Sequence, residues 1–174
     1  MNMTRSAETV SGRSGDGAEA RLFSLLASVT DPEIPVLTIE EMGILRRAWF
    51  EGDRVMVEIT PTYSGCPAIE QISDDIRVAL AQHGYADVEI HRSLSPAWTT
   101  DWLTESSRQK LEAYGVAPPC QTSAMTESAV SLTVRCPQCR SDDTRVVSEF
   151  GSTACKALWK CNHCLEPFDF FKPL

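Results

Sequence analysis

The feature that most constrains this chain is a pair of CxxC motifs in its last third. They are 21 residues apart and are formed by Cys136, Cys139, Cys161 and Cys164. Two thiolates from each motif can reach one tetrahedral ion at about 2.3 Å, and four thiolates leave no position for water or substrate. This spacing is typical of a zinc ribbon, so we predict a closed structural zinc site. Rubredoxin-like iron is the alternative, because four thiolates also suit iron.

The segment around these motifs is too small to fold on its apolar side chains alone. It offers only short runs that could form strands, at residues 132–135, 144–149, 158–160 and 168–171. A module of about 40 residues rarely folds without a metal or disulfides, so the metal must supply folding free energy. We predict an all-β zinc ribbon over residues 132–174 that acts as a scaffold or docks a partner.

The first half of the chain has the pattern of a compact α+β domain. Helical periodicity occurs at residues 18–29 and 67–84, and strand-like runs occur at 44–50, 54–60 and 88–91. The first two strands are close enough for a hairpin, whereas the third follows a helix and can pair in parallel through a right-handed crossover. We predict the order α-β-β-α-β over residues 18–94.

Three further segments complete the predicted organisation. Residues 1–17 are rich in Ser, Gly and Thr, and they predict a disordered tail without the apolar stretch of a secretory signal. Residues 95–120 predict an ordered extension with a short helix from Glu105 to Tyr114, packed on the core. Residues 121–131 are small and polar, as expected of a linker.

Composition and charge narrow the class of protein. No apolar run approaches the roughly 20 residues that span a bilayer, so we expect a cytoplasmic protein without membrane contact. In that reducing compartment, seven cysteines indicate metal binding or thiol chemistry rather than a disulfide framework. The formal net charge of -8 would repel a phosphate backbone, so we expect no nucleic-acid partner.

A separate thiol, Cys66, lies between the strand that ends at Thr60 and the helix predicted to begin at Pro67. This makes Cys66 the expected N-cap, where the helix dipole can lower a thiol pKa below its ordinary value near 8.5. Such a thiol could bind metal or attack an electrophile, although a buried structural cysteine is the commoner case. Asp31 and Glu33 are the acidic candidates in a proline-braced loop, and capping explains them equally well.

The sequence offers no base for a thiol-dependent enzyme. His83 and His91 fall by pattern on a helix and a strand with no reason to meet Cys66, and His163 lies inside the second CxxC motif. Cys155, shortly before that motif, is more often a packed thiol than a fifth ligand. We expect a protein that is not catalytic on its own; a hydrolase of acyl-CoA is the disfavoured alternative.

Several runs resemble known families. Residues 18–93 resemble the iron-sulfur assembly domain of SufT. Three runs carry this resemblance: Asp31-Pro32-Glu33-Ile34-Pro35, Met42-Gly43-Ile44-Leu45 and Thr60-Pro61-Thr62-Tyr63-Ser64-Gly65-Cys66-Pro67. The runs at residues 98–104, 114–119 and 150–157 resemble a narrower family, PaaD, also called PaaJ. Its members are small accessory subunits of the multicomponent phenylacetyl-CoA epoxidase of aerobic phenylacetate degradation.

This resemblance implies maturation of metal centres rather than the oxidation itself. The client would be the di-iron centre of the oxygenase or the iron-sulfur cluster of the reductase. Cys66 would hold iron or a cluster transiently, with Asp31 and Glu33 as its acidic loop, Cys155 as an accessory thiol, and the four motif cysteines as zinc ligands. Implied partners are the oxygenase and reductase subunits and the iron-sulfur assembly machinery, with a homodimer also open. The alternative is a structural subunit of the oxygenase complex that transfers no metal.

Overall fold

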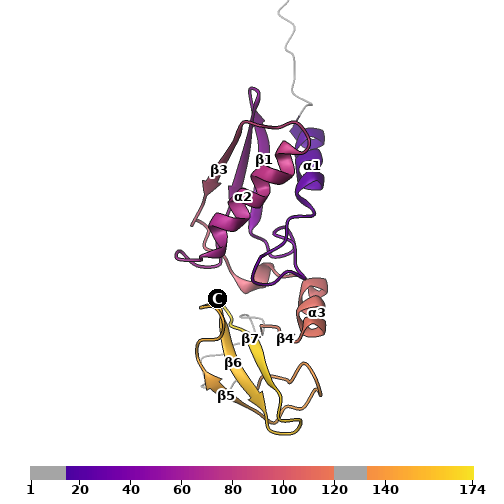
Figure 1. Cartoon of the computed structure of the whole chain (residues 1–174), viewed down its shortest axis with the longest axis vertical. Helices are drawn as coiled ribbons and strands as arrows, with labels where there is room; N and C mark the ends of the chain where they lie inside the picture. The colour runs from indigo at the N-terminus through magenta and orange to yellow at the C-terminus, as the bar shows by residue number, and fades with distance from the viewer. Residues whose placement is uncertain (1–14, 120–132) are drawn as a thin grey trace, which may run out of the picture.

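The structure, a computed structural model, describes residues 15–119 and 133–174. The predicted linker and nearly all of the predicted tail lie outside these ranges. Figure 1 shows an elongated molecule in which an N-terminal unit of helices and strands stacks on a small β unit. Among the described residues, no helix combines the length and apolar character needed to cross a membrane.

The N-terminal unit packs two helices against a three-stranded sheet (Figure 1). Its elements are α1 (Gly15–Leu26), β1 (Leu45–Glu51), β2 (Arg54–Ile59), α2 (Ala68–Ala81) and β3 (Val88–Arg92). β1 and β2 pair antiparallel, and β3 pairs in parallel with β2, which gives the order β1-β2-β3. The predicted α-β-β-α-β order and the parallel third strand are confirmed.

Local sequence explains why these elements form. In β2, Val55, Val57 and Ile59 alternate and are buried in the core between sheet and helices. In α2, the buried apolar residues recur at helical spacing and pack on the same core: Ile69, Ile72, Ile76 and Leu80. Gly52 has a φ of +65°, the left-handed conformation that closes the β1–β2 hairpin.

The extension after β3 connects the two units. It contains the 3-10 turn η1 (Thr100–Trp102), the helix α3 (Glu105–Tyr114) and the strand β4 (Val116–Ala117). The helix has the predicted bounds because the Thr104 hydroxyl accepts the Ser107 N–H at its start and Gly115, with a φ of +95°, ends it. The first part of the extension is held to the N-terminal unit by Trp98, whose Nε1–H donates to the Met42 carbonyl at 2.9 Å.

The C-terminal unit, the ribbon, is a four-stranded sheet in the order β4-β7-β6-β5. Its own strands are β5 (Thr144–Ser148), β6 (Lys156–Cys161) and β7 (Pro167–Phe171). β6 pairs antiparallel with β5 and β7, while β4 from the extension pairs in parallel with β7. Three of the predicted strands form, but residues 133–135 belong to no strand, and β4 takes the fourth place in the sheet.

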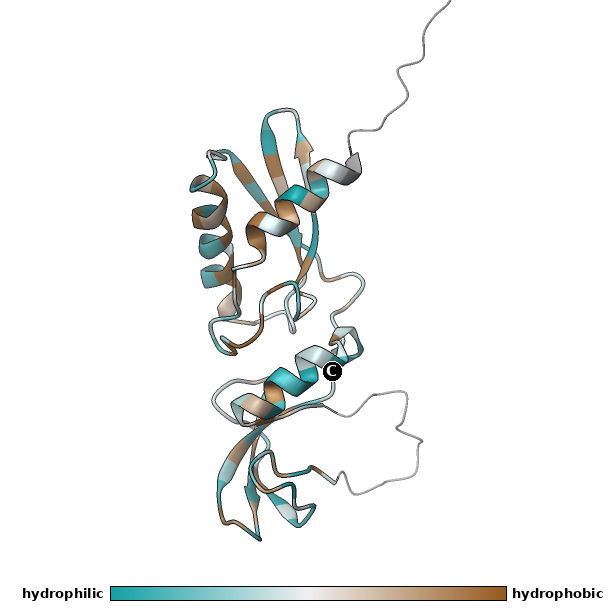
Figure 2. Cartoon of the chain, turned by 90° about the vertical axis from the view of Figure 1, so that its right-hand side faces the viewer, coloured by the Kyte–Doolittle hydropathy of each residue, from teal (hydrophilic) through white to brown (hydrophobic). Residues whose placement is uncertain are grey.

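A continuous core joins the two units. Phe171, the last residue of β7, is fully buried with its ring centroid 5.9 Å from that of Trp98. Cys155, just before β6, belongs to the same cluster rather than to the smaller apolar cluster inside the ribbon. The chain ends at this junction, where the Thr100 N–H donates to the Leu174 carbonyl at 3.2 Å (Figure 1 and Figure 2).

This shared core predicts the effect of truncating Phe171. We expect Phe171→Ala to lower the free energy of unfolding by about 3–5 kcal/mol, because it removes a buried ring and leaves a cavity. Urea denaturation of the metal-loaded protein measures this loss. Phe150→Ala is the matched control, since Phe150 is 65% exposed and should cost less than about 1 kcal/mol. Equal losses in the two variants would contradict the shared core.

Candidate metal centre and interdomain thiol cluster

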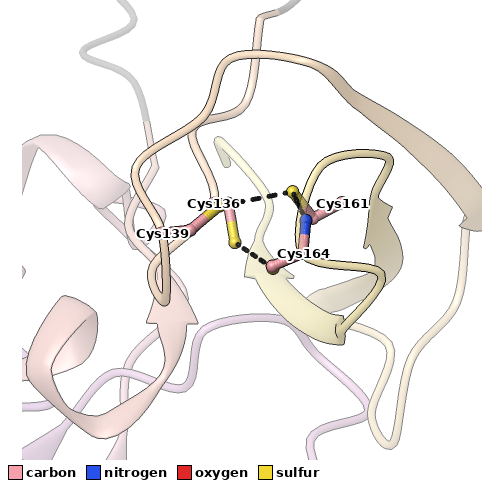
Figure 3. Close-up of side chains that lie close together, drawn as sticks. All are labelled: Cys136, Cys139, Cys161 and Cys164. Atoms are coloured by element: carbon pink, nitrogen blue, oxygen red, sulfur yellow. Dashed lines mark hydrogen bonds between the residues drawn. The ribbon is translucent and has the colours of Figure 1, made fainter.

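The four motif cysteines lie together in the ribbon (Figure 3). Their Sγ atoms are all within 4.8 Å of one another, with 3.7 Å between Cys136 and Cys164 and 3.5 Å between Cys139 and Cys161. A tetrahedral ion with metal–sulfur bonds of about 2.3 Å requires sulfur separations of roughly 3.8 Å. The four sulfurs therefore fit one metal ion, and such an ion would have no open position for a substrate.

The two CxxC turns share one backbone form. In each, the N–H of the first cysteine donates to the carbonyl five residues later at 3.0 Å. The residue after the second cysteine, Arg140 or Leu165, has a positive φ of 63° or 66°. A left-handed conformation costs a residue other than glycine roughly 1–2 kcal/mol. Each of the two turns therefore needs a favourable interaction that offsets this cost. Metal–thiolate bonds, which form only when the turns close, can supply that compensation.

Thiols this close cannot all ionise without a cation. Desolvation opposes ionisation of Cys161, but the N–H groups of Cys164 and His163, each 3.4 Å from its sulfur, lower the pKa of Cys161 to about 6. The Glu166 N–H favours the Cys164 thiolate, yet desolvation and the neighbouring thiols raise the pKa of Cys164 to about 12. Binding of a divalent ion would resolve this conflict and release the protons that the thiols still carry.

A second group of ionisable side chains lies where the ribbon meets the N-terminal unit. We call it the thiol–carboxylate cluster, and its members are Asp31, Glu33, Tyr63, Cys66, Cys155 and Lys156. The two units contribute different members, because Cys155 and Lys156 come from the ribbon. Burial is the largest cause that raises the pKa of both Cys66 and Cys155. The negative charges of the Glu33 and Asp31 carboxylates raise both pKa values further.

The acidic loop between α1 and β1 holds Asp31 in a fixed position. The residue is 4% exposed, and its Oδ1 accepts the N–H groups of Glu33 at 2.8 Å and Ile34 at 2.9 Å. Burial raises the pKa of Asp31 in spite of these two donors and the charge of Lys156. Burial and the charge of Asp31 likewise raise the pKa of Glu33. The loop thus presents two carboxylates whose charge is poorly solvated.

Cys66 departs from prediction in two ways. Pro67 is the N-cap of α2, so Cys66 lies one residue before the cap rather than at it. Burial raises the pKa of Cys66 and outweighs the lowering by the Ala68 N–H and the Thr62 hydroxyl. The expected low pKa is therefore wrong: the thiol packs against the apolar core, and desolvation exceeds the effect of the helix start.

The loop between β5 and β6 ends at Cys155, and together with Lys156, the first residue of β6, it forms the ribbon's part of the cluster. The Thr153 hydroxyl lies 3.0 Å from the Cys155 sulfur, and the Lys156 ammonium lies 3.6 Å from Asp169 Oδ2 with its side chain only 6% exposed. Gly151 permits this fold, since a Cβ there would lie 2.9 Å from Asp169 Oδ1. Sequence reasoning missed Lys156; the only signal was its place beside Cys155 in a run shared with a known family.

The metal centre and the thiol–carboxylate cluster are separate sites. Cys155 precedes the first residue of β6, and Cys161, a metal-centre cysteine, is its last. Six extended residues span about 20 Å, so one strand carries a thiol of each site at its two ends.

Two family models match complementary parts of the chain. An iron-sulfur cluster assembly protein model matches residues 19–91, and a PaaD zinc β-ribbon domain model matches residues 120–172. A crystal structure of a domain of unknown function, DUF59, from Bacillus anthracis superposes with a TM-score of 0.52 at 24% identity, over 56% of this chain and 94% of that one. That likeness shows the fold of about half of this chain.

Curated relatives match over different lengths. A protein of Escherichia coli K12, provisionally named as one of the subunits of 1,2-phenylacetyl-CoA epoxidase, is 47% identical over 87% of this chain and 90% of its own length. An Fe-S protein maturation auxiliary factor of Porphyromonas gingivalis is 30% identical over 53% of this chain and 90% of its own. SufT of Staphylococcus aureus, also named as an Fe-S protein maturation auxiliary factor, is 30% identical over 46% of this chain and 92% of its own.

Metal removal should unfold the ribbon selectively. We expect a strong chelator to abolish the dispersed amide resonances of β5 and β6, because the ribbon's own apolar cluster is small, while those of β1–β3 keep their dispersion. Two-dimensional NMR before and after chelation measures this, and re-addition of metal is the control. A ribbon that keeps its resonances without metal would show that its core suffices.

Burial of Asp31 predicts an unusual pH dependence. A carboxyl group whose pKa is raised on folding destabilises the native state above that pKa, and the penalty is relieved as the pH falls through it. We expect Asp31→Asn, which keeps an acceptor for both amides, to unfold at a higher urea concentration than wild type at pH 7. The difference should shrink on acidification. A variant that is less stable at pH 7 would show that the carboxylate stabilises the fold.

Proposed function

The chain belongs to the PaaD family, and we propose that it matures a metal centre of the phenylacetyl-CoA epoxidase system without being catalytic on its own. The relatives support two parts of this role. The relative with 47% identity is named as an epoxidase subunit, and the two relatives that match about half of this chain are named as Fe-S protein maturation auxiliary factors. A protein that joins both likenesses fits an accessory factor dedicated to one client enzyme in aerobic phenylacetate degradation.

The observation that carries the proposal is the placement of Cys66 beside the acidic loop. Glu33 and Asp31 both act on its pKa, so a thiol and two carboxylates from separate segments share one electrostatic environment. Thiolate and carboxylate together suit iron, which accepts both sulfur and oxygen ligands. Burial raises the pKa values of Asp31, Glu33 and Cys66, so their charged forms are disfavoured while no cation is bound, which suits a carrier that must also release its cargo. Iron or an iron-sulfur cluster is that cargo.

The ribbon has a different role in this proposal. Its metal is zinc, since the matching family model is a zinc ribbon, and the four-thiolate geometry closes the site. A closed site performs no chemistry, so the zinc stabilises a surface that docks the oxygenase or reductase subunits. Exposed Val146, Val147 and Phe150 on and beside β5 offer apolar contact area for such a partner. Cytoplasmic assembly machinery would load the carrier.

A purely structural subunit is the second candidate, because the epoxidase relative is named as a subunit. In that case the chain would hold the oxygenase components together and transfer no metal. Stoichiometric copurification with the active complex favours this alternative. An active purified complex without the chain excludes it.

Coexpression with the epoxidase components tests the carrier role. We expect Cys66→Ala to lower client iron content and epoxidase activity at least several-fold, because the transient ligand is lost. Ser64→Ala is the matched control, as Ser64 is an exposed residue of the same turn. Anaerobic metal analysis of the purified chain should give one equivalent of zinc in wild type and variant, with additional iron only in wild type. Unchanged client iron in Cys66→Ala would refute a role for this thiol.

A further inference from the structure

We propose that the outer edge of β5 binds an extended segment of a partner protein as an additional strand, and that acidic and apolar residues alternate in this segment. The surface is formed by Arg145, Val146, Val147 and Lys160, and we call it the basic edge. This inference rests on the docking role proposed for the ribbon. It adds the chemistry of the partner segment and the way in which it binds.

The strand β5 is the longer open edge of the ribbon sheet. Figure 1 shows it at the side of the ribbon, and among the described residues it pairs only with β6. At the opposite edge, β4 spans only Val116–Ala117 and offers less backbone. An edge strand presents N–H and C=O groups that have no partner strand, and an extended peptide can pair with them.

Two like charges lie opposite each other beside this edge. Arg145 of β5 and Lys160 of β6 are cross-strand partners, so their side chains project from the same face of the sheet. Neither pairs with a carboxylate of the described residues, whereas three other cations of the ribbon do: Arg135, Arg140 and Lys156. Like charges in this position destabilise a sheet. In a chain with a formal net charge of -8, this local positive charge indicates an acidic partner.

The apolar residues of the edge lie beside these cations. Val146 and Val147 are each 50% exposed, and the exposed Phe150 follows the strand with the Lys172 ammonium 4.6 Å from its ring centroid. Val146 follows Arg145 in β5, so the two side chains project from opposite faces of the sheet. An added strand that alternates acidic and apolar residues would therefore place carboxylates beside Arg145 and apolar side chains beside Val146.

The same charges argue against a second copy of this chain as the occupant. Two β5 strands paired antiparallel about a two-fold axis would join two sheets with the same faces aligned. The joined face would carry Arg145 and Lys160 of both copies, and these cations repel one another. The register shift between Val146 and Ser148 is a further obstacle, because a bulge at an edge opposes pairing of two rigid sheets. A flexible segment can follow such a bulge.

Peptide binding to the full chain, with zinc in the ribbon, tests the inference. The probes are two labelled peptides of about six residues, one that alternates Glu with Val and one that alternates Lys with Val. We expect fluorescence anisotropy to show that the Glu peptide binds about tenfold more tightly than the Lys peptide, because only its charges complement the edge. Two-dimensional NMR should place the shifted amide resonances in β5.

Charge reversal makes the test independent of a simple loss of fold. We expect Arg145→Glu and Lys160→Glu each to weaken binding of the Glu peptide about tenfold and to strengthen binding of the Lys peptide. A variant that had only lost its fold would gain no affinity for the Lys peptide. Arg77→Glu reverses an exposed cation of α2 and is the matched control, which should bind both peptides as wild type does.

Coexpression with the epoxidase components connects the basic edge to the client. We expect Arg145→Glu to lower copurification of the oxygenase or reductase subunits several-fold, because reversal of this charge repels an acidic segment. Arg77→Glu should leave copurification unchanged. Equal copurification of the client with the two variants would show that the client docks elsewhere, and it would overturn the inference.

The outcomes separate this inference from the function on which it rests. Equal binding of the two peptides, or no shift of the β5 amides at millimolar peptide, would overturn the basic edge as a site for an acidic strand. A dimer in sedimentation that Val147→Lys dissociates would assign the edge to a second copy and overturn it as well. Maturation is tested separately by client iron in Cys66→Ala. Unchanged iron there, with the expected peptide results, would refute maturation and leave the edge as the docking site of a structural subunit.

Discussion

The four-sulfur cage is the constraint on which the ribbon depends. Its strands are short and its own apolar cluster is small, so a metal ion must hold the two CxxC turns together. Because Cys161 ends β6, the ion also fixes the strand whose other end presents Cys155 and Lys156. The closed, unreactive centre thus determines where Cys155 and Lys156 lie, about 20 Å away along that strand.

Desolvation sets the chemistry at the junction. Burial is the largest cause that raises the pKa of Asp31, Glu33, Cys66 and Cys155, so each group resists ionisation until a cation compensates its charge. An activated nucleophile needs the opposite condition, a thiol that is already ionised. The environment therefore favours reversible metal binding over covalent catalysis, in agreement with the accessory role proposed from the family likeness.

Features that depend on local pattern were predictable from sequence, and features that depend on docking were not. Periodicity gave the order of the N-terminal elements, and Gly115 gave the end of α3, because a glycine cap is a local signal. Each CxxC motif is also a local pattern, and the spacing of the two motifs predicted one site of four cysteines. The pKa of Cys66 was predicted in the wrong direction, since its burial comes from tertiary packing. Nothing local indicated that Lys156 would be buried beside the acidic loop.

The pairing of β4 with β7 determines where the chain can be cut to give a ribbon fragment, or joined to another protein in a gene fusion. The ribbon sheet takes one edge strand from residues that precede its first cysteine, so the conventional boundary of a zinc module cuts through the sheet. A fragment that starts after that strand would expose the backbone of β7 beside its phenylalanines, an edge prone to aggregation. Gene fusions that preserve this architecture should therefore carry α3 and β4 along with the cysteines.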